Sequence, residues 1–329
     1  MNINLSNIQN NIFGNDKSIN FFLKNLSANN DGNIWMLNGP KGIGKSTLTK
    51  LISANLLKIK YNNKKENTFF HPDLIILSKS EKKHISVDEI RNLKKLFFKT
   101  SYSDSYRIAI IDSINDINLH GHNALLKTIE EPPENSFIFI INHQNNYIPA
   151  TIKSRCKLLN LNSISDNEVL TILKKMNFSK NEKELFFYSK ISNGSVGDAI
   201  YFLTNKSLDM YKLLCDHLIQ IQDFDENNTN NIINKITDNK NALMLVFFKL
   251  LNILINKVIK KKFLGHDSNI IEEEKLLIEH FNLIYNEKTI FYIKDLIEYK
   301  YNSFISLNTD LHSTLYSLLI EMHKIVKNN

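Results

Sequence analysis

The stretch "GPKGIGKST" holds the side chains best suited to chemistry in this sequence. Its residues fit the spacing G-x-x-x-x-G-K-[ST], directly after a short apolar run and at the start of a helix-like segment. Glycines in this arrangement let backbone N–H groups surround a phosphate, while the lysine reaches the outer phosphates and the hydroxyl binds Mg²⁺. The residues expected to bind a nucleotide are Gly39, Gly42, Gly44, Lys45, Ser46 and Thr47.

The stretch "RIAIID" is an apolar run that ends in Asp112. A carboxylate at the end of a strand can bind the Mg²⁺ of a bound nucleotide, so Asp112 and Ser46 are the predicted metal ligands. Many nucleotide-hydrolysing proteins place a glutamate next, but this chain has Ser113, whose hydroxyl has no pKa suited to a general base. Asp116 is a possible substitute base, although a surface turn residue is the simpler interpretation.

The elements that must position these residues alternate between strand-like and helix-like segments in the first half of the chain. The strand-like segments are 33–39, 73–78, 107–112 and 136–142. This alternation predicts an α/β fold, a parallel sheet with helices on both faces. The segment 87–100 is one of the helices, with Ile90, Leu93, Leu96 and Phe97 expected on its buried face.

Beyond the strand-like segments the sequence becomes helical. We expect three domains, a nucleotide-binding domain over 1–160, a helical lid over 161–205 and an all-α domain over 206–329. The apolar stretch 242–259 is interrupted by lysine and asparagine, so it is predicted to be a buried helix and not a membrane span. The polar segments 62–67 and 226–235 are predicted to be solvated loops.

Composition limits the possible classes of protein. The chain has 329 residues and a net charge of +7, which permits contact with nucleic acid but does not require it. Its two cysteines, Cys156 and Cys215, cannot form a disulfide framework or a four-thiolate zinc site. The N-terminus lacks the features of a signal peptide, so a cytoplasmic location is expected.

Several of these motifs carry a resemblance to a known family. "NIFGNDKSINFFLKNL", "GPKGIGKST", "HPDLIIL", "ISVDEIRNL", "IAIID", "NALLKTIEEPP" and "TIKSRC" resemble, in order and spacing, the AAA+ clamp-loader subunits of bacterial replicases. The resemblance covers residues 8–160. It implies a P-loop AAA+ core followed by a helical lid and a helical collar that mediates oligomerisation.

The resemblance also implies cofactors and partners. The expected ligand is ATP or ADP with Mg²⁺, without zinc, because the four-cysteine module of many relatives is missing between the first helix and the second strand. The expected partners are motor subunits and the clamp-opening subunit, in a hetero-oligomer that belongs to the DNA polymerase III holoenzyme. Indirect or weak contact with DNA is expected, and no membrane.

Arg155 follows a strand and loop, and its position alone is compatible with an ordinary surface arginine. In the family the arginine of "SRC" completes the ATP site of the adjacent subunit, which implies that Arg155 is an arginine finger acting in trans. Cys156 beside it is then a structural residue.

The chain departs from the motor subunits of the family at two positions. Ser113 replaces the glutamate after the metal-binding aspartate, and Gly197 occupies the slot of the arginine that senses the γ-phosphate. The polar sensor at the end of the fourth strand is either Asn142 or His143. These departures imply a stationary subunit, which binds nucleotide but has weak or absent ATPase activity.

Two other functions remain as alternatives. One is an ATP-hydrolysing motor subunit of the same family. The other is a small-molecule kinase, which is disfavoured because residues 159–205 contain no arginine for a catalytic lid. The lone His71 is better explained as a packing or turn residue than as a metal ligand. His120 and His122 flank Gly121 and could form a metal-binding pair, but a polar loop is the better explanation.

Overall fold

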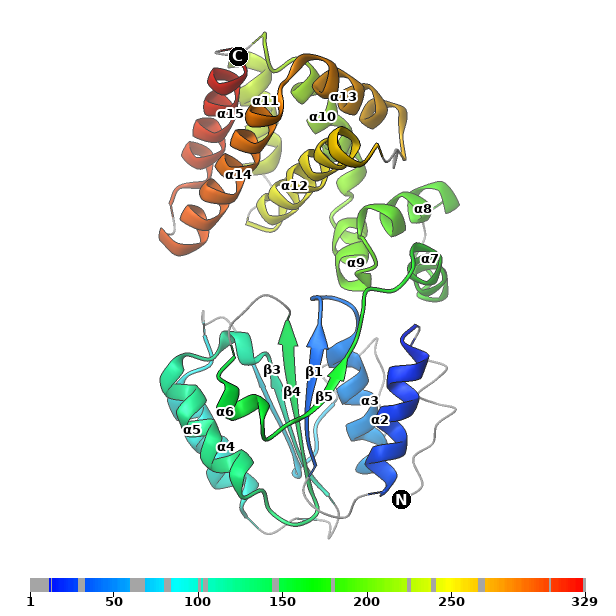
Figure 1. The fold of residues 1–329 in the computed structure, drawn as a ribbon, viewed down its shortest axis with the longest axis vertical. Helices are drawn as coiled ribbons and strands as arrows, with labels where there is room; N and C mark the ends of the chain where they lie inside the picture. Colours follow the sequence, from blue (N-terminus) through cyan, green and yellow to red (C-terminus); the bar gives the residue numbers. More distant parts are fainter. Residues whose placement is uncertain are drawn as a thin grey trace. The chain divides into compact units, whose positions relative to one another are not determined.

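The protein is described by a computed structural model (Figure 1). The residues that it describes are 12, 14–28, 33–59, 69–79, 84–99, 102, 106–143, 148–178, 181–223, 226–237, 241–265, 270–307 and 309–327. They fall into two compact units. The first lies within Met1–Asn177 and Ser192–Gly197, and the second within Phe178–Ile191 and Asp198–Asn329.

The first unit is built on a five-stranded parallel sheet with the strand order β2-β3-β4-β1-β5. The strands are β1 (Asn33–Gly39), β2 (Leu74–Ser78), β3 (Arg107–Asp112), β4 (Ser136–His143) and β5 (Lys157–Asn160). The four predicted strands and the parallel α/β fold are confirmed. The sequence did not predict β5, an edge strand in which only Leu159 is buried.

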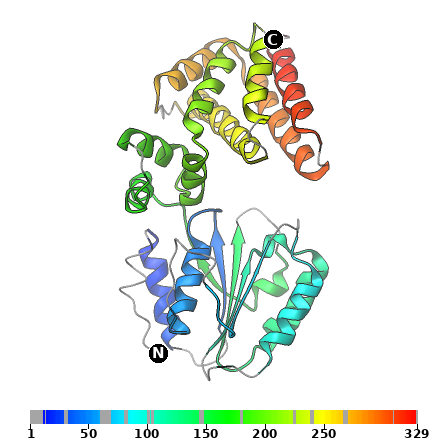
Figure 2. The same cartoon turned by 180° about the vertical axis from the view of Figure 1, so that it is seen from behind.

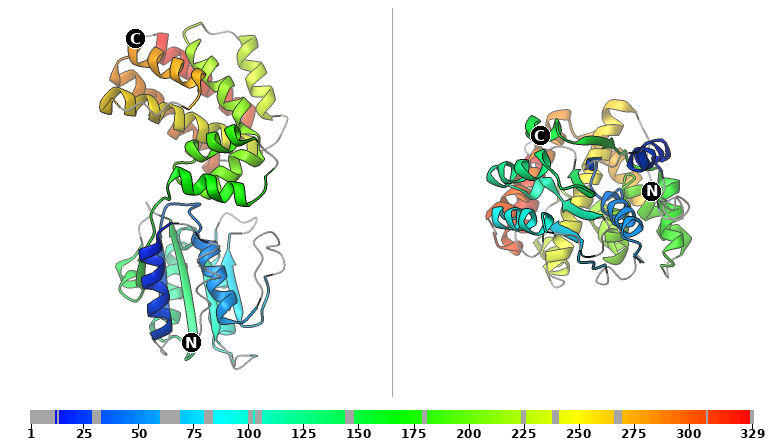
Figure 3. Two further views of the ribbon diagram at one scale, coloured as in Figure 1. Left: turned by 90° about the vertical axis from the view of Figure 1, so that its right-hand side faces the viewer. Right: turned by 90° about the horizontal axis from the view of Figure 1, so that it is seen from below.

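Helices cover both faces of this sheet, as the two opposite views in Figures 1 and 2 show. One face carries α2 (Asp16–Ala28) and α3 (Lys45–Leu56), and the other carries α4 (Val87–Phe97), α5 (Leu119–Glu130) and α6 (Ala150–Lys153). The view from below in Figure 3 separates these two helical layers. Each layer buries its own apolar cluster against the sheet, and burial of this kind is the main stabilising contribution to such a domain.

In helix α4, the local sequence determines both where the helix begins and which face is buried. It begins at a capping box, in which the Ser86 hydroxyl accepts from the Glu89 N–H and the Glu89 carboxylate accepts from the Ser86 N–H at 2.7 Å. Ile90, Leu93 and Phe97 are buried as expected, but Leu96 is exposed. Positions 90, 93 and 97 follow the helical repeat, whereas position 96 is turned away from that face.

Three short helices follow β5, namely α7 (Asp166–Lys175), α8 (Glu182–Ile191) and α9 (Val196–Thr204). A capping box of Ser165 and Glu168 starts α7. The turn between α8 and α9, Ser192–Gly197, belongs to the first unit and brings the start of α9 to the nucleotide loop described below.

The second unit contains the remaining helices. They are α10 (Ser207–Ile219), α11 (Glu226–Thr237), α12 (Asn241–Leu264), α13 (Glu272–Ile284), α14 (Glu287–Leu307) and α15 (Leu311–Lys327). Helix α12 contacts α10, α11, α13 and α14, so the predicted buried helix over 242–259 is confirmed. None of the helices within the described ranges is long and apolar enough to cross a bilayer.

The loop predicted over 226–235 is wrong, because these residues form most of α11. Ile232, Ile233 and Ile236 are buried at helical spacing, and α11 packs against α12 and α15. The burial of these isoleucines outweighs the weak helix propensity of the surrounding asparagines. The other predicted loop, 62–67, lies outside the described residues.

Candidate nucleotide-binding site

The phosphate loop connects the end of β1 to the start of α3. Gly44 precedes the first residue of α3 with φ of 97°, a left-handed conformation that favours glycine. No side chain caps the N-terminus of α3 at Gly44, so the N–H groups of its first turn have no capping side chain. Free N–H groups at a helix N-terminus, with the helix dipole behind them, are suited to bind a phosphate.

Lys45 is buried at the first position of α3. Its ammonium group donates to the carbonyl oxygens of Gly39, at 2.7 Å, and of Pro40. Burial lowers the pKa of Lys45 to about 8, and the charge of Asp112 acts in the opposite direction. Ser46 and Thr47 follow in the same turn and are half-buried, so the predicted loop residues do form one continuous segment.

Asp112 reaches the same edge of the sheet from β3. Strands β1 and β3 both pair with β4 in parallel, which brings the carboxyl ends of all three strands to one edge. The electrostatic interaction between Asp112 and Lys45 is consistent with this arrangement. The ends of these strands therefore bring together the predicted lysine and the predicted metal-binding carboxylate.

Ser113, the residue after Asp112, forms a hydrogen bond with Asp116. Ser113 is buried, and its hydroxyl donates to a carboxylate oxygen of Asp116 at 2.7 Å. The other carboxylate oxygen of Asp116 lies 3.8 Å from the ammonium nitrogen of Lys79. Asp116 is therefore held by a hydroxyl and an ammonium group.

The end of β4 distinguishes the two sensor candidates by their hydrogen bonds. The Asn142 side chain accepts from Asn115 at 3.1 Å and donates to Asn38 at 2.9 Å, and Asn38 donates in turn to Asn160 at 3.0 Å. These four amides form a ladder across the carboxyl end of the sheet. The amide of Asn142 is thus occupied by its neighbours.

His143, the next residue, has a buried Nδ1 atom with no hydrogen-bond partner among the described residues. Burial first, and then the charge of Lys45, lower the pKa of His143 to about 4, so the ring is neutral at pH 7. An unpaired buried nitrogen beside Lys45 and Asp112 is a group that a ligand can satisfy.

The start of α9 lies directly on the phosphate loop. The N–H of Gly197 donates to the carbonyl of Gly42 at 2.9 Å, and the Ser195 hydroxyl donates to the carbonyl of Lys41 at 3.2 Å. A Cβ atom at position 197 would lie 3.0 Å from the Cα atom of Gly42. Gly197, the position expected to replace the sensor arginine, therefore makes a close backbone contact with Gly42.

Arg155 lies in the first unit, in the turn between α6 and β5. It precedes β5, and the first residue of β5, Lys157, pairs with Trp35, four residues before Gly39 on β1. Because a strand rises about 3.3 Å per residue, the start of β5 is about 13 Å from the end of β1 that bears the phosphate loop. Arg155 precedes this strand, so it lies away from the phosphate loop of its own chain.

The guanidinium of Arg155 has partners that the sequence did not predict. One terminal nitrogen lies 2.9 Å from a carboxylate oxygen of Glu130, and the other donates to the carbonyl of Thr151 at 2.9 Å. Glu130 ends α5 within the motif "NALLKTIEEPP", which marked the position but gave no role for its glutamates. Cys156 packs against the apolar cluster below α5, and burial raises the pKa of its thiol to about 12, as suits a structural residue.

The site has no further cluster of metal ligands. Across the described ranges, no three histidine, cysteine, aspartate or glutamate side chains lie close enough together to hold a metal ion. The candidate Mg²⁺ ligands Ser46 and Asp112 provide two oxygen donors, which is typical of a magnesium site that a nucleotide completes.

Comparison with known proteins assigns the chain to a family. Residues 14–165 match the family model described as DNA polymerase III, delta subunit. A DNA polymerase III subunit delta' of Buchnera aphidicola subsp. Baizongia pistaciae is 29% identical over 262 residues, which cover 72% of this chain and 73% of that protein.

Two further relatives match shorter segments. A subunit delta' of Pseudomonas aeruginosa is 32% identical over 133 residues, 37% of this chain and 40% of that protein. A subunit gamma of Buchnera aphidicola subsp. Schizaphis graminum is 30% identical over 183 residues, 51% of this chain and 50% of that protein. With the parallel sheet, the phosphate loop and the helical second half, these matches support a delta-prime-like clamp-loader subunit of DNA polymerase III.

Proposed function

We propose that this chain is a stationary clamp-loader subunit, which binds ATP or ADP but does not hydrolyse ATP efficiently. It lends Arg155 to an ATP site on a neighbouring motor subunit, and so helps to load the sliding clamp on DNA. The position of Arg155 carries this proposal, since its side chain is half-exposed and the strand that follows it begins beside Trp35, away from the end of β1 that bears the phosphate loop. The matches to delta-prime subunits support the same assignment.

The residues of the loop fit a bound nucleotide. The uncapped start of α3 and the buried ammonium group of Lys45 suit the phosphates, and the glycines Gly39, Gly42 and Gly44 leave the loop backbone free of side chains. Ser46 and Asp112 would hold Mg²⁺, which supplies positive charge to the β- and γ-phosphates. His143 is the sensor candidate that we favour, because its Nδ1 has no partner among the described residues whereas the amide of Asn142 has two.

Weak hydrolysis follows from the surroundings of the metal-binding aspartate. A general base must have a suitable pKa and a free acceptor atom within reach of the attacking water. Ser113 lacks the pKa, and the carboxylate of Asp116 is held by Ser113 and faced by Lys79. Gly197 supplies no charge to the γ-phosphate from the start of α9.

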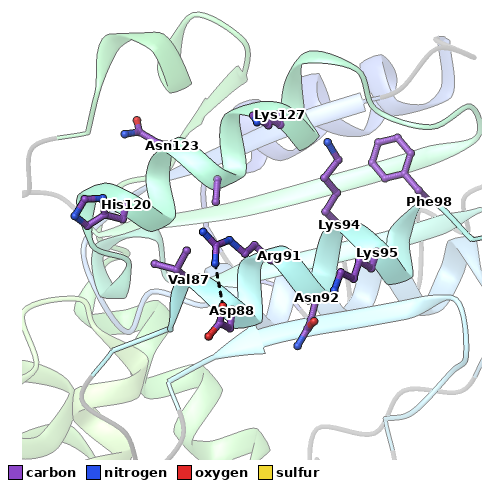
Figure 4. Close-up of a pocket in the computed structure, with 11 residues that line it drawn as sticks. Val87, Asp88, Arg91, Asn92, Lys94, Lys95, Phe98, His120, Asn123 and Lys127 are labelled. Carbon is purple, nitrogen blue, oxygen red and sulfur yellow. Dashed lines mark hydrogen bonds and ion pairs between the residues drawn. The ribbon is translucent and has the colours of Figure 1, made fainter.

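A groove between α4 and α5 supports a direct but weak contact with DNA. Figure 4 shows Arg91 and Lys94 extending from α4 toward α5. The groove has a volume of about 1410 Å³ and is lined by four basic side chains, Arg91, Lys94, Lys95 and Lys127, and by one acidic side chain, Asp88. Arg91 is paired with Asp88 at 3.2 Å, so the remaining charge suits phosphate groups without a specific base contact.

The partners and the location follow from the same role. We infer a hetero-oligomer with motor subunits and the clamp-opening subunit, in the cytoplasm, where replication takes place. The helices of the second unit, the predicted collar, would join this chain to the other subunits.

The experiment that tests this proposal compares complexes reconstituted with motor subunits and clamp. Arg155→Ala should lower ATP hydrolysis by the complex at least about tenfold, because an arginine finger contributes several kcal/mol to the transition state. Lys153→Ala, an exposed lysine of α6, is the matched control and should have no effect. Unchanged hydrolysis with Arg155→Ala would contradict the role in trans.

The alternative function is a motor subunit, which the similarity to the gamma subunit favours. A motor subunit would hydrolyse ATP on its own, and Lys45→Ala would abolish that activity. The stationary role predicts that the purified chain binds nucleotide with no such turnover.

A further inference from the structure

The side chain of Glu130 holds Arg155 from a second element. Its carboxylate lies 2.9 Å from one terminal nitrogen of the guanidinium, while the carbonyl of Thr151 accepts from the other terminal nitrogen at 2.9 Å. Glu130 is the last residue of α5, and Thr151 belongs to α6. The guanidinium is thus fixed at two of its three nitrogens by acceptors on two different helices.

The residues that supply the two acceptors each adjoin a buried side chain. Ile129 of α5 and Ile152 of α6 are buried next to Glu130 and Thr151, and α5 ends before Pro132, which cannot continue a helix. Fixed acceptors restrict the rotamers of a long side chain, so the orientation of the guanidinium is set before any ligand arrives.

The contact between Glu130 and Arg155 adds little to the stability of the fold. The two side chains are 45% and 38% exposed, and ion pairs at such positions contribute little to folding. An arginine has five N–H donors in a fixed plane, so two can be held by protein acceptors while the others remain for a phosphate. The geometry therefore suits a role in orientation better than a role in stability.

We propose that Glu130 is a positioning residue, which aims the guanidinium of Arg155 at the γ-phosphate bound by the neighbouring subunit. This inference rests on the proposed function of Arg155 in trans. Glu130 itself does not touch the nucleotide. It accepts one hydrogen bond from the guanidinium, which leaves the outward N–H groups directed at the incoming phosphate.

The test uses the full chain in a complex reconstituted with motor subunits, and measures kcat and KM for ATP. Glu130→Ala should lower kcat about three- to tenfold, because a misplaced catalytic group loses rate. KM should change less than about twofold, since an arginine finger acts chiefly on the charge of the transition state. Glu130→Gln keeps an oxygen that accepts the hydrogen bond, so it should stay within about twofold of the wild-type kcat.

Two controls accompany these variants. Glu131→Gln changes the adjacent exposed glutamate, which has no contact with Arg155 among the described residues, and should leave kcat unchanged. Thermal unfolding of Glu130→Ala should shift by less than about 2 °C, as expected for an exposed ion pair.

The outcomes separate this inference from the proposed function. If Arg155→Ala lowers kcat but Glu130→Ala does not, the positioning role is overturned and the arginine finger stands. If Arg155→Ala has no effect, the proposed function itself fails. Equal losses of kcat in Glu130→Ala and Glu130→Gln would show that the charge of Glu130 matters and not the orientation that it gives to Arg155. A higher kcat with either variant would show that Glu130 competes with the phosphate for Arg155. Either of these last two results overturns the inference.

Discussion

At the scale of single residues, the amine of Lys45 decides how the site depends on pH. Its pKa is lowered from 10.5 to about 8 because the loop buries the charge against two carbonyl groups. Burial disfavours the charged form of Lys45 more than the charge of Asp112 favours it, whereas a bound phosphate would favour the charged form further. Protonation of Lys45 and binding of a nucleotide are therefore coupled.

The coupling gives a prediction for nucleotide affinity. Above pH 8 the free chain loses the proton of Lys45, so binding of ATP must take up a proton and should weaken about tenfold per pH unit. An exposed lysine would keep its charge to about pH 10. Equilibrium binding of a fluorescent ATP analogue between pH 7.5 and 9.5 measures this slope.

Lys45→Ala is the control for this measurement. It should bind about 100-fold more weakly at pH 7.5, with no slope above pH 8. Lys58→Ala, an exposed lysine just after α3, should behave as the wild type. A wild-type affinity that stays constant to pH 9.5 would contradict the coupling.

At the scale of elements, an ion pair joins two helices of the second unit. The ammonium of Lys257 on α12 lies 2.5 Å from the carboxylate of Glu274 on α13. Glu274 is fully buried, and its other carboxylate oxygen accepts from the N–H of Ile270 at 3.1 Å. Each charge depends on the other, because an unpaired charge in such a place is costly.

Removal of one partner should therefore destabilise the fold more than removal of both. Lys257→Met leaves the carboxylate buried without its cation, which should lower the free energy of unfolding by about 3–5 kcal/mol. The double variant Lys257→Met, Glu274→Gln has no buried charge and should recover most of that loss. Chemical denaturation of the three proteins checks this, and equal losses for the single and double variants would refute it.

At the scale of the whole molecule, the net charge is +7, and part of this excess of basic residues lines the groove between α4 and α5. Basic side chains on both helices line it, with a single acidic residue. Contacts with phosphate groups release counterions, so their contribution to affinity falls steeply with salt. The groove therefore predicts binding of DNA that is weak and sensitive to salt.

A charge-reversal experiment tests this groove. Lys94→Glu with Lys127→Glu should weaken binding of duplex DNA by the assembled complex and reduce the slope of log K against log salt by about two. Lys275→Glu with Lys288→Glu changes the net charge equally on the exposed surface of the second unit and should have a smaller effect. Equal effects of the two pairs would show that net charge alone governs binding.

The sequence predicted much of the first unit because its signals are local. The buried strand "SFIFIIN" and the phosphate loop each carry their own pattern, and the structure has both where they were expected. The short edge strand β5 was missed because only Leu159 in it is buried. The order of the strands and the pairing of Arg155 with Glu130 depend on contacts between distant segments, which no local pattern contains.

The burial of Ser113 limits which side chains this position can accept. Ser113 is only 1% exposed, and its hydroxyl donates to the carboxylate of Asp116. A glutamate in its place would therefore lie beside that carboxylate and next in sequence to Asp112. Like charges that close would resist ionisation, so the new carboxyl would enter this space at a cost in free energy. We therefore expect Ser113→Glu to be tolerated better when Asp116 is replaced by a neutral residue in the same protein.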